Sequence, residues 1–200
     1  MRVSPTAIPD VLVLEQKVFS DARGFFYESY NRKAFARATG LDLEFVQDNH
    51  SRSAKNVLRG LHYQVRQAQG KLVRVTAGEI WDVAVDLRRS SPSFGRWVGM
   101  TLDAGSRRML WVPAGFAHGF LVLSEFAEVQ YKATDYYAPE HERTLLWNDP
   151  ALAIAWPLAG EPAAQPTMTD KDRRGTPLAG AETFDYDRDR EQGPVQNSLQ

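Results

Sequence analysis

The chain has 200 residues, 43% of them hydrophobic and 24% charged, a balance typical of one folded domain that excludes global disorder. Its 24 basic and 25 acidic side chains give a net charge of −1, so no broad positive field exists and we expect no nucleic-acid partner. The absence of cysteine excludes disulfides, thiolate metal sites and a cysteine nucleophile.

The chain also lacks the sequence features of a membrane or secreted protein. No apolar run approaches the ~18 residues that a membrane-spanning helix needs. Pro5, Pro9 and Asp10 interrupt what would have to be the apolar core of a secretory signal. We therefore expect a cytoplasmic protein with no membrane partner.

The first half of the chain consists mostly of short, β-rich runs separated by turn residues. Val11–Phe19 is aliphatic and β-branched, and an aromatic run follows over Phe25–Tyr30. The clearest helix covers Asn31–Thr39, where Asn31 can cap the first turn and Gly40 can end the last. The next predicted strands are Leu43–Gln47, Val57–Gln64 and Lys71–Thr76.

The second half continues this pattern. Glu79–Arg88 alternates between two faces, one with Trp81, Val83, Val85 and Leu87, the other with Asp82, Ala84, Asp86 and Arg88. Further strands are predicted over Arg96–Leu102, Met109–Val112, Ala117–Leu123 and Ala127–Thr134. About nine or ten strands with one clear helix are typical of an all-β sandwich or barrel.

Prolines accumulate after Asn148 and predict irregular structure laid over the sandwich, at Pro150, Pro157, Pro162, Pro166 and Pro177. No linker divides the chain. We therefore predict one domain over residues 1–180 and a polar C-terminal tail over residues 181–200.

Two histidines and a tyrosine are the first candidates for chemistry. Strand alternation places His118 on one face with Phe120 and Val122, and Tyr131 on one face of the next strand with Val129 and Ala133. If these faces coincide inside a barrel, a histidine and a tyrosine point into one cavity. The alternative is that Tyr131 is a core tyrosine with a satisfied hydroxyl.

Common short motifs are missing, which narrows the chemistry. The sequence has no G-x-G-x-x-G, no complete phosphate loop, no H-E-x-x-H and no G-x-S-x-G. Pro113-x-Gly115-x-x-His118 resembles the second motif of the cupin superfamily. The first motif would supply a His-x-His pair, but His62-Tyr63-Gln64 has one imidazole. A site with two histidines and a carboxylate stays open in principle, and the missing histidine favours a cupin without metal.

Longer stretches together resemble one family, the dTDP-4-dehydrorhamnose 3,5-epimerases. They are Val57–Gln64, Gly70–Val75, Ser91–Trp97 and Trp111–Phe120, with flanking signatures at Asp21–Phe26, Gln47–Ser51 and Thr169–Asp172. The resemblance runs from about residue 2 to residue 180, in the family's order and spacing. It implies a cupin-type β jelly roll with a few short helices, a homodimer and no cofactor. It also implies epimerisation at C3 and C5 of a dTDP-linked 4-keto-6-deoxyhexose, for a surface polysaccharide such as the lipopolysaccharide O-antigen.

The resemblance also implies roles for individual residues. His62 is expected to be the base, oriented by Asp172, with Asp170 as the alternative carboxylate. Tyr131 is the expected acid on the opposite face of the sugar, because a phenol with a pKa of about 10 is protonated at neutral pH. Lys71 is expected beside the keto oxygen, where it would stabilise negative charge; otherwise it is a solvated edge-strand lysine.

Further residues match substrate-binding positions of the family. Arg59 and Arg23 are candidates for the pyrophosphate, and either could instead be an ordinary surface arginine. Tyr137 resembles the aromatic residue that stacks on thymine, with simple packing as the alternative. The other matched positions are Glu28, Gln47, Asn49, His118, Glu142 and Lys171. No metal ligand is assigned.

Three other functions compete with full 3,5-epimerisation. A relative with the same fold could epimerise one carbon or isomerise the ketone, although Tyr131 favours the double reaction. A non-catalytic sugar-binding cupin would have no use for both a tyrosine acid and a histidine–aspartate base. A metal-dependent cupin enzyme would be separated by metal analysis of the purified protein.

Overall fold

The computed structural model describes residues 1–158 and 165–185. The strands in this part of the chain are β1 (Arg2–Pro5), β2 (Leu12–Glu15), β3 (Phe19–Asp21), β4 (Gly24–Phe26), β5 (Gln47–Ala54), β6 (Leu58–Gln64), β7 (Lys71–Ala77), β8 (Glu79–Asp86), β9 (Trp97–Asp103), β10 (Met109–Val112), β11 (Phe116–Val122), β12 (Phe126–Ala133) and β13 (Glu142–Thr144). The α-helices are α1 (Arg32–Thr39) and α2 (Asp170–Arg173). Short 3₁₀ helices cover Pro139–His141 and Leu178–Gly180.

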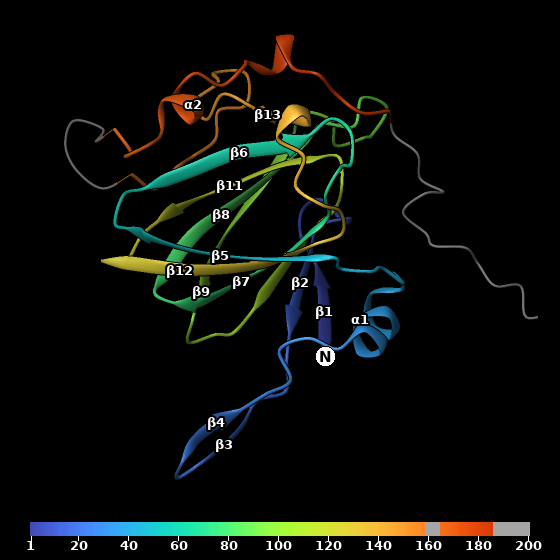
Figure 1. Cartoon of the computed structure of the whole chain (residues 1–200), viewed down its shortest axis with the longest axis vertical. Coiled ribbons are helices and arrows are strands. Elements are labelled where there is room, and N and C mark those ends of the chain that lie inside the picture. The colour runs from blue at the N-terminus through green and yellow to red at the C-terminus, as the bar shows by residue number, and fades with distance from the viewer. Residues whose placement is uncertain (159–164, 186–200) are drawn as a thin grey trace, which may run out of the picture.

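Two antiparallel sheets form the body of the molecule (Figure 1). One has the strand order β1-β2-β10-β7-β12-β5, and the other has the order β13-β6-β11-β8-β9. Buried side chains from both sheets meet in one cluster, with Val73 and Val129 from the first sheet and Ala84 and Phe120 from the second. The predicted all-β jelly roll is confirmed.

Helix α1 forms as the sequence predicts. The Asn31 side chain accepts a hydrogen bond from the Ala34 backbone N–H, and Gly40 ends the helix with a φ of 78°. The helix buries Phe35 against Phe45 and Trp111 on the outer face of the six-stranded sheet.

The strand predicted over Leu43–Gln47 is wrong. Strand β5 begins at Gln47 and covers the polar segment Gln47–Ala54 instead. The apolar side chains before it, including Leu43 and Phe45, pack in the cluster around Phe35. Their hydrophobicity reflects contact with the helix region, and pairing with β12 holds the polar strand in place.

The outer face of the five-stranded sheet is covered by the segment that follows β13. Leu152, Ile154 and Trp156 pack against Val83 and Val85 of β8, which confirms irregular structure laid over the sandwich. Pro162, where irregular structure was also predicted, lies outside the described residues.

The boundary at residue 180 stays a prediction. Ala181 is buried, and Phe184 forms a β-bridge with Arg88, so residues just beyond 180 contact the body. Residues 186–200 of the expected tail lie outside the described part. No helix within that part is long and apolar enough to cross a membrane.

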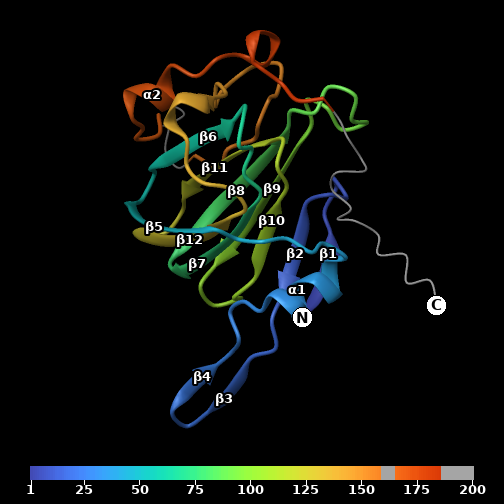
Figure 2. The ribbon, with the colours of Figure 1, turned by 45° about the vertical axis from the view of Figure 1, so that its right-hand side comes forward.

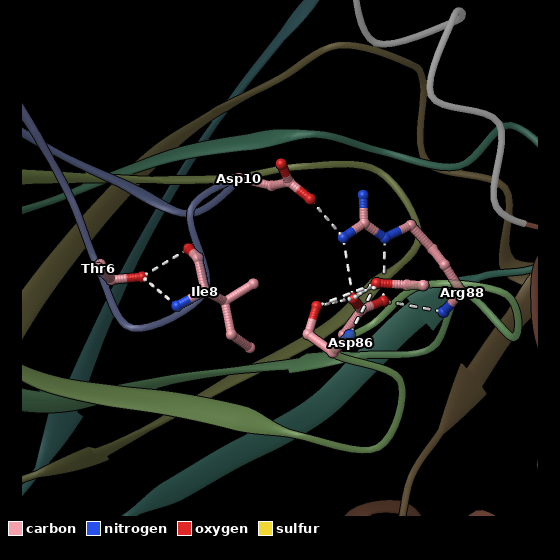
Figure 3. Close-up of polar contacts among 7 residues, drawn as sticks. Thr6, Ile8, Asp10, Asp86 and Arg88 are labelled. Carbon is pink, nitrogen blue, oxygen red and sulfur yellow. Dashed lines mark hydrogen bonds and ion pairs between the residues drawn. The ribbon is translucent and has the colours of Figure 1, made fainter.

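A buried ionic cluster fastens the N-terminal turn to the end of β8 (Figure 3). Arg88 donates to Asp86 from Nε at 2.9 Å and from its Nη2 at 2.8 Å, and Nη2 also lies 2.7 Å from Asp10. The Ser91 and Ser93 hydroxyls donate to Asp86 at 2.7 and 2.6 Å. Because both charges of the buried Asp86–Arg88 pair are hydrogen-bonded, the pair is compatible with burial.

Strands β3 and β4 form a hairpin that projects from the body (Figures 1 and 2). We call residues 19–26 the arm. Its aromatic side chains Phe19, Phe25 and Phe26 are exposed. The arm extends on the side of the molecule away from β6 in both views.

Candidate functional site

Most predicted site residues lie on the inner faces of the two sheets, at one end of the body. Tyr131 of β12 is paired with Asn49 of β5, and directly opposite residues of neighbouring strands share a face. Lys71 is paired with Ala133, two residues from Tyr131, and so lies on this face too. On the second sheet His62 is paired with His118. Phe120 and Val122, which share the face of His118, pack in one cluster with Val129 and Tyr131, so the predicted coincidence of the His118 and Tyr131 faces is confirmed.

His62 and Asp172 form a close pair. Nε2 of His62 lies 2.6 Å from Oδ1 of Asp172, and the carboxylate is buried while the imidazole side chain is 27% exposed. Burial opposes ionisation, but the bonds from His62 and from the Gly60 backbone lower the pKa of Asp172. With Nε2–H donating to the carboxylate, Nδ1 carries the lone pair that can take a proton.

Local backbone structure places Asp172 beside His62. Thr169 caps α2, and its hydroxyl accepts the Asp172 backbone N–H at 3.2 Å. The Gly60 backbone N–H points at Oδ2 of Asp172, at 3.5 Å. Gly60 has a φ of 116°, and a Cβ there would lie 2.6 Å from Cα of Gly119, so only glycine permits this approach of β6 to β11. Asp170, the alternative carboxylate, is 84% exposed.

A second histidine–carboxylate pair lies beside the first. His118 Nε2 is 2.9 and 3.0 Å from the two carboxylate oxygens of Asp82, and both residues are buried. Sequence reasoning assigned no role to Asp82. The sequence shows Asp82 only as one of the polar residues that alternate with apolar ones along Glu79–Arg88. The pairing of β8 with β11 is what brings it to His118.

Lys71 and Tyr131 bring a cation and a phenol to the opposite sheet. Lys71 is buried, and burial lowers its pKa from 10.5 to about 8, against the opposing influence of Glu142 and Asp82. The ammonium lies 5.8 Å from the centroid of the Tyr131 ring. Burial raises the pKa of Tyr131, which keeps the phenol protonated at neutral pH. Lys71 is therefore not the solvated edge-strand lysine that the sequence left open.

Polar residues form the rim of the site. Glu142 of β13 accepts hydrogen bonds from the Tyr137 hydroxyl at 3.0 Å and from Lys171 at 2.7 Å. Burial acts to raise the pKa of Glu142, but the bond from Lys171, the charge of His62 and the bond from Tyr137 outweigh it and lower the pKa. Gln47 donates to Asn49 and accepts the Tyr137 backbone N–H.

Arg59 lies on the inner side of β6, opposite Phe120 of β11, and donates to the Ser53 hydroxyl of β5 at 2.8 Å. It therefore spans from one sheet to the other. A cation in this position can meet an anionic group at the site.

Two predicted binding residues are not brought to this site. Arg23 lies on the arm, where its side chain is 90% exposed and pairs with Asp21 at 2.6 Å. Glu28 follows the arm and accepts a hydrogen bond from Asn31, beside helix α1. The sequence motifs that carry these residues did not reveal that the arm leaves the body.

The site has the parts needed to move a proton at a carbon next to a carbonyl. A histidine that can accept a proton faces a tyrosine that can donate one, with a lysine available for the charge on oxygen. Within residues 1–158 and 165–185, no group of three or more histidine and carboxylate side chains is placed to hold a metal ion.

Comparisons with known proteins agree with this chemistry. The family model described as dTDP-4-dehydrorhamnose 3,5-epimerase matches residues 5–180. The chain is 61% identical to the dTDP-4-dehydrorhamnose 3,5-epimerase of Pseudomonas aeruginosa over 184 residues, which are 92% of this chain and 99% of the relative.

Solved structures show the same likeness. A 3,5-epimerase from Legionella pneumophila in complex with dTDP-4-keto-L-rhamnose superposes with a TM-score of 0.89 at 49% identity, over 93% of this chain and 98% of the other. A 3'-monoepimerase from Streptomyces bikiniensis is more distant, with a TM-score of 0.80 and 33% identity over 90% of this chain and 88% of the other.

Proposed function

This chain belongs to the dTDP-4-dehydrorhamnose 3,5-epimerase family, and we propose how its residues divide the work of that reaction. It is an isomerase that converts dTDP-4-dehydro-6-deoxy-D-glucose to dTDP-4-dehydro-L-rhamnose in dTDP-L-rhamnose biosynthesis. Both inverted carbons, C3 and C5, lie next to the C4 ketone, which acidifies their protons. Each inversion needs a base on one face, stabilisation of the enolate, and an acid on the other face.

We propose that His62 is the base at both carbons. The observation that carries this role is the 2.6 Å contact between His62 and Asp172, with the carboxylate buried and the imidazole partly exposed. Asp172 fixes the tautomer that leaves Nδ1 free and stabilises the imidazolium that forms when His62 takes the proton. The proton can later exchange with solvent from the partly exposed ring.

Tyr131 is the proposed acid. It lies on the six-stranded sheet, whereas His62 lies on the five-stranded sheet, so a sugar between them has one group on each face. The raised pKa keeps the phenol protonated, so it can donate its proton to the carbon of the enolate. Lys71 would stabilise the enolate oxygen, and His118, held by Asp82, would contact the sugar or the same oxygen.

The nucleotide half of the substrate is assigned to the rim. We propose that Arg59 meets the pyrophosphate and that Tyr137 stacks on the thymine. The remaining proposed contacts are Gln47, Asn49, Glu142 and Lys171. The Legionella relative was solved with a dTDP-linked sugar, which supports this substrate class. No cofactor enters the proposal.

A homodimer would explain the two residues that lie away from the site. If the arm of one copy reaches the site of the other, Arg23 and Glu28 join the substrate contacts. The exposed phenylalanines of the arm would then be covered. A sedimentation mass equal to one chain would contradict this assembly. The cytoplasmic location and the use of the product in the O-antigen stay predictions.

Two neighbouring aspartates provide a matched test of the proposed base. Asp172→Asn keeps the shape of the side chain but removes the charge that holds the imidazole, so kcat should fall about 10²–10⁴-fold, as for loss of general base catalysis. Asp170→Asn changes an exposed carboxylate on the same helix and should keep kcat within about twofold. Equal activity of the two variants would refute the assignment of the base.

A further inference from the structure

Gln64 is a buried polar residue to which the proposed function gives no role. It is 4% exposed and lies on β6, two residues after His62. Its side-chain amide makes three hydrogen bonds to backbone groups. Nε2 donates to the carbonyl oxygens of Gln67 at 2.7 Å and Tyr136 at 3.1 Å, and Oε1 accepts the Ala138 backbone N–H at 2.9 Å.

Two of these bonds hold the peptide groups on either side of Tyr137. The Tyr136 carbonyl belongs to the peptide that precedes Tyr137, and the Ala138 N–H belongs to the peptide that follows it. The N–H of Tyr137 itself donates to Gln47 at 2.9 Å, and its hydroxyl donates to Glu142 at 3.0 Å. Gln64 and Gln47 therefore hold the backbone of the exposed Tyr137, and Glu142 holds the hydroxyl of its ring.

Only an amide side chain satisfies the three backbone groups around Gln64. Two carbonyl oxygens require donors and one N–H requires an acceptor, and glutamine supplies both from one planar group. A glutamate would keep the acceptor but oppose both carbonyls, and a methionine would leave all three groups without this partner. The N–H of the buried Ala138 would be the most costly group to leave without a partner, so the loop would move to find water.

From this geometry we propose that Gln64 is a positioning residue that sets Tyr137 over the nucleobase of the substrate. The inference rests on the proposed stacking of Tyr137. His62 and Gln64 lie two residues apart on β6. The strand therefore holds the catalytic base, His62, at a fixed distance from the loop that carries Tyr137. The rigid strand thereby sets how far the reacting sugar lies from the nucleobase.

The test measures nucleotide binding and turnover separately in single and double variants. Gln64→Met removes the three hydrogen bonds with little change in side-chain length. We expect it to weaken dTDP binding and raise KM about tenfold, while kcat at saturating substrate stays within about threefold. Gln64→Glu keeps the acceptor for Ala138 but places a buried carboxylate against the two carbonyl oxygens, so it should weaken dTDP binding at least as much as Gln64→Met. Gln130→Met is the control, because strand alternation places Gln130 on the outer face of β12, where it bonds to Arg74, and it should bind dTDP like the unmodified protein.

A double-mutant cycle distinguishes positioning from general damage. If Gln64 acts through Tyr137, the variant with both Gln64→Met and Tyr137→Ala should bind dTDP no more weakly than Tyr137→Ala alone. Additive losses, or equal falls in kcat and kcat/KM, would overturn the inference. So would unchanged dTDP binding in both Gln64 variants when Tyr137→Ala binds weakly. If Gln64→Met does not fold, Gln64→Glu is judged by the same cycle.

The proposed stacking of Tyr137 is tested separately from the role of Gln64. If Tyr137→Ala binds dTDP normally, the stacking role fails. The inference about Gln64 rests on that stacking and then fails with it, whereas weak dTDP binding in Tyr137→Ala with normal binding in the Gln64 variants removes the inference alone. Weak dTDP binding in the Tyr137 variant together with a non-additive Gln64 effect supports both.

Discussion

Replacing Lys71 with methionine should reduce activity and increase stability in the same protein. The Lys71 ammonium is buried on the inner face, beside Tyr131. In the proposed mechanism it stabilises the negative charge that forms on the ketone oxygen. Removing one such group from an oxyanion site costs about 10²–10³-fold in kcat. Lys71→Met should therefore lose about this much turnover.

The effect on stability follows from the pKa of the same group. Burial lowers the pKa of Lys71 from 10.5 to about 8, so between these values the unfolded chain binds a proton that the folded chain does not. The free energy of unfolding therefore rises with pH across this interval, by about 1.4 kcal/mol per pH unit. Below pH 8 the folded protein carries the full cost of the buried charge, about 3 kcal/mol. Lys71→Met should raise the free energy of unfolding by about this amount at pH 7, and by little near pH 10.5.

Urea unfolding at pH 7 and pH 10, with kinetics from pH 6 to 9.5, measures both effects. In the unmodified protein kcat/KM should fall above pH 8, about tenfold per pH unit, as Lys71 loses its proton. The variant should lack this decline. A variant that is less stable than the unmodified protein at pH 7, or an unchanged pH profile, would refute the reasoning about Lys71.

Three other predictions test separate parts of the structure. Tyr131→Phe should lose about 10²–10⁴-fold of L-sugar formation but keep measurable solvent exchange at C3 or C5, because His62 can still remove and return a proton; product at the normal rate would mean that the phenol only packs. Asp86→Asn should lower the free energy of unfolding by about 3 kcal/mol, since Arg88 stays buried without its main anionic partner; an unchanged urea midpoint would contradict this. Activity should persist in excess chelator, because the proposed chemistry uses no metal, and loss of activity that a divalent cation restores would overturn that view.

Much of the fold, and the faces of two site residues, could be predicted from local patterns, whereas the roles of His62, Asp172 and Lys71 came from the resemblance to a family. Alternation in β11 and β12 assigned His118 and Tyr131 to defined faces, and Asn31 and Gly40 defined the ends of α1. These features depend on neighbouring residues in the chain. They are therefore visible in the sequence itself.

Features that depend on distant strands could not be predicted in the same way. Asp82 becomes the partner of His118 only because β8 pairs with β11, and neither segment contains a sequence pattern that indicates this pairing. Strand β5 is polar along its length and gives no hydrophobic signal. Arg23 lies at the tip of the arm, so its position depends on the direction in which the arm leaves the body (Figure 1), and no local motif encodes this direction.

Solvent exchange tests the central claim most directly. The protein is incubated with dTDP-4-keto-6-deoxyglucose in heavy water, and the product is analysed by NMR, with His62→Ala as the control. If His62 removes protons beside the ketone, the L-sugar should carry deuterium at both C3 and C5, and the control should give neither exchange nor product. Deuterium at one carbon alone, or normal exchange by His62→Ala, would contradict the account.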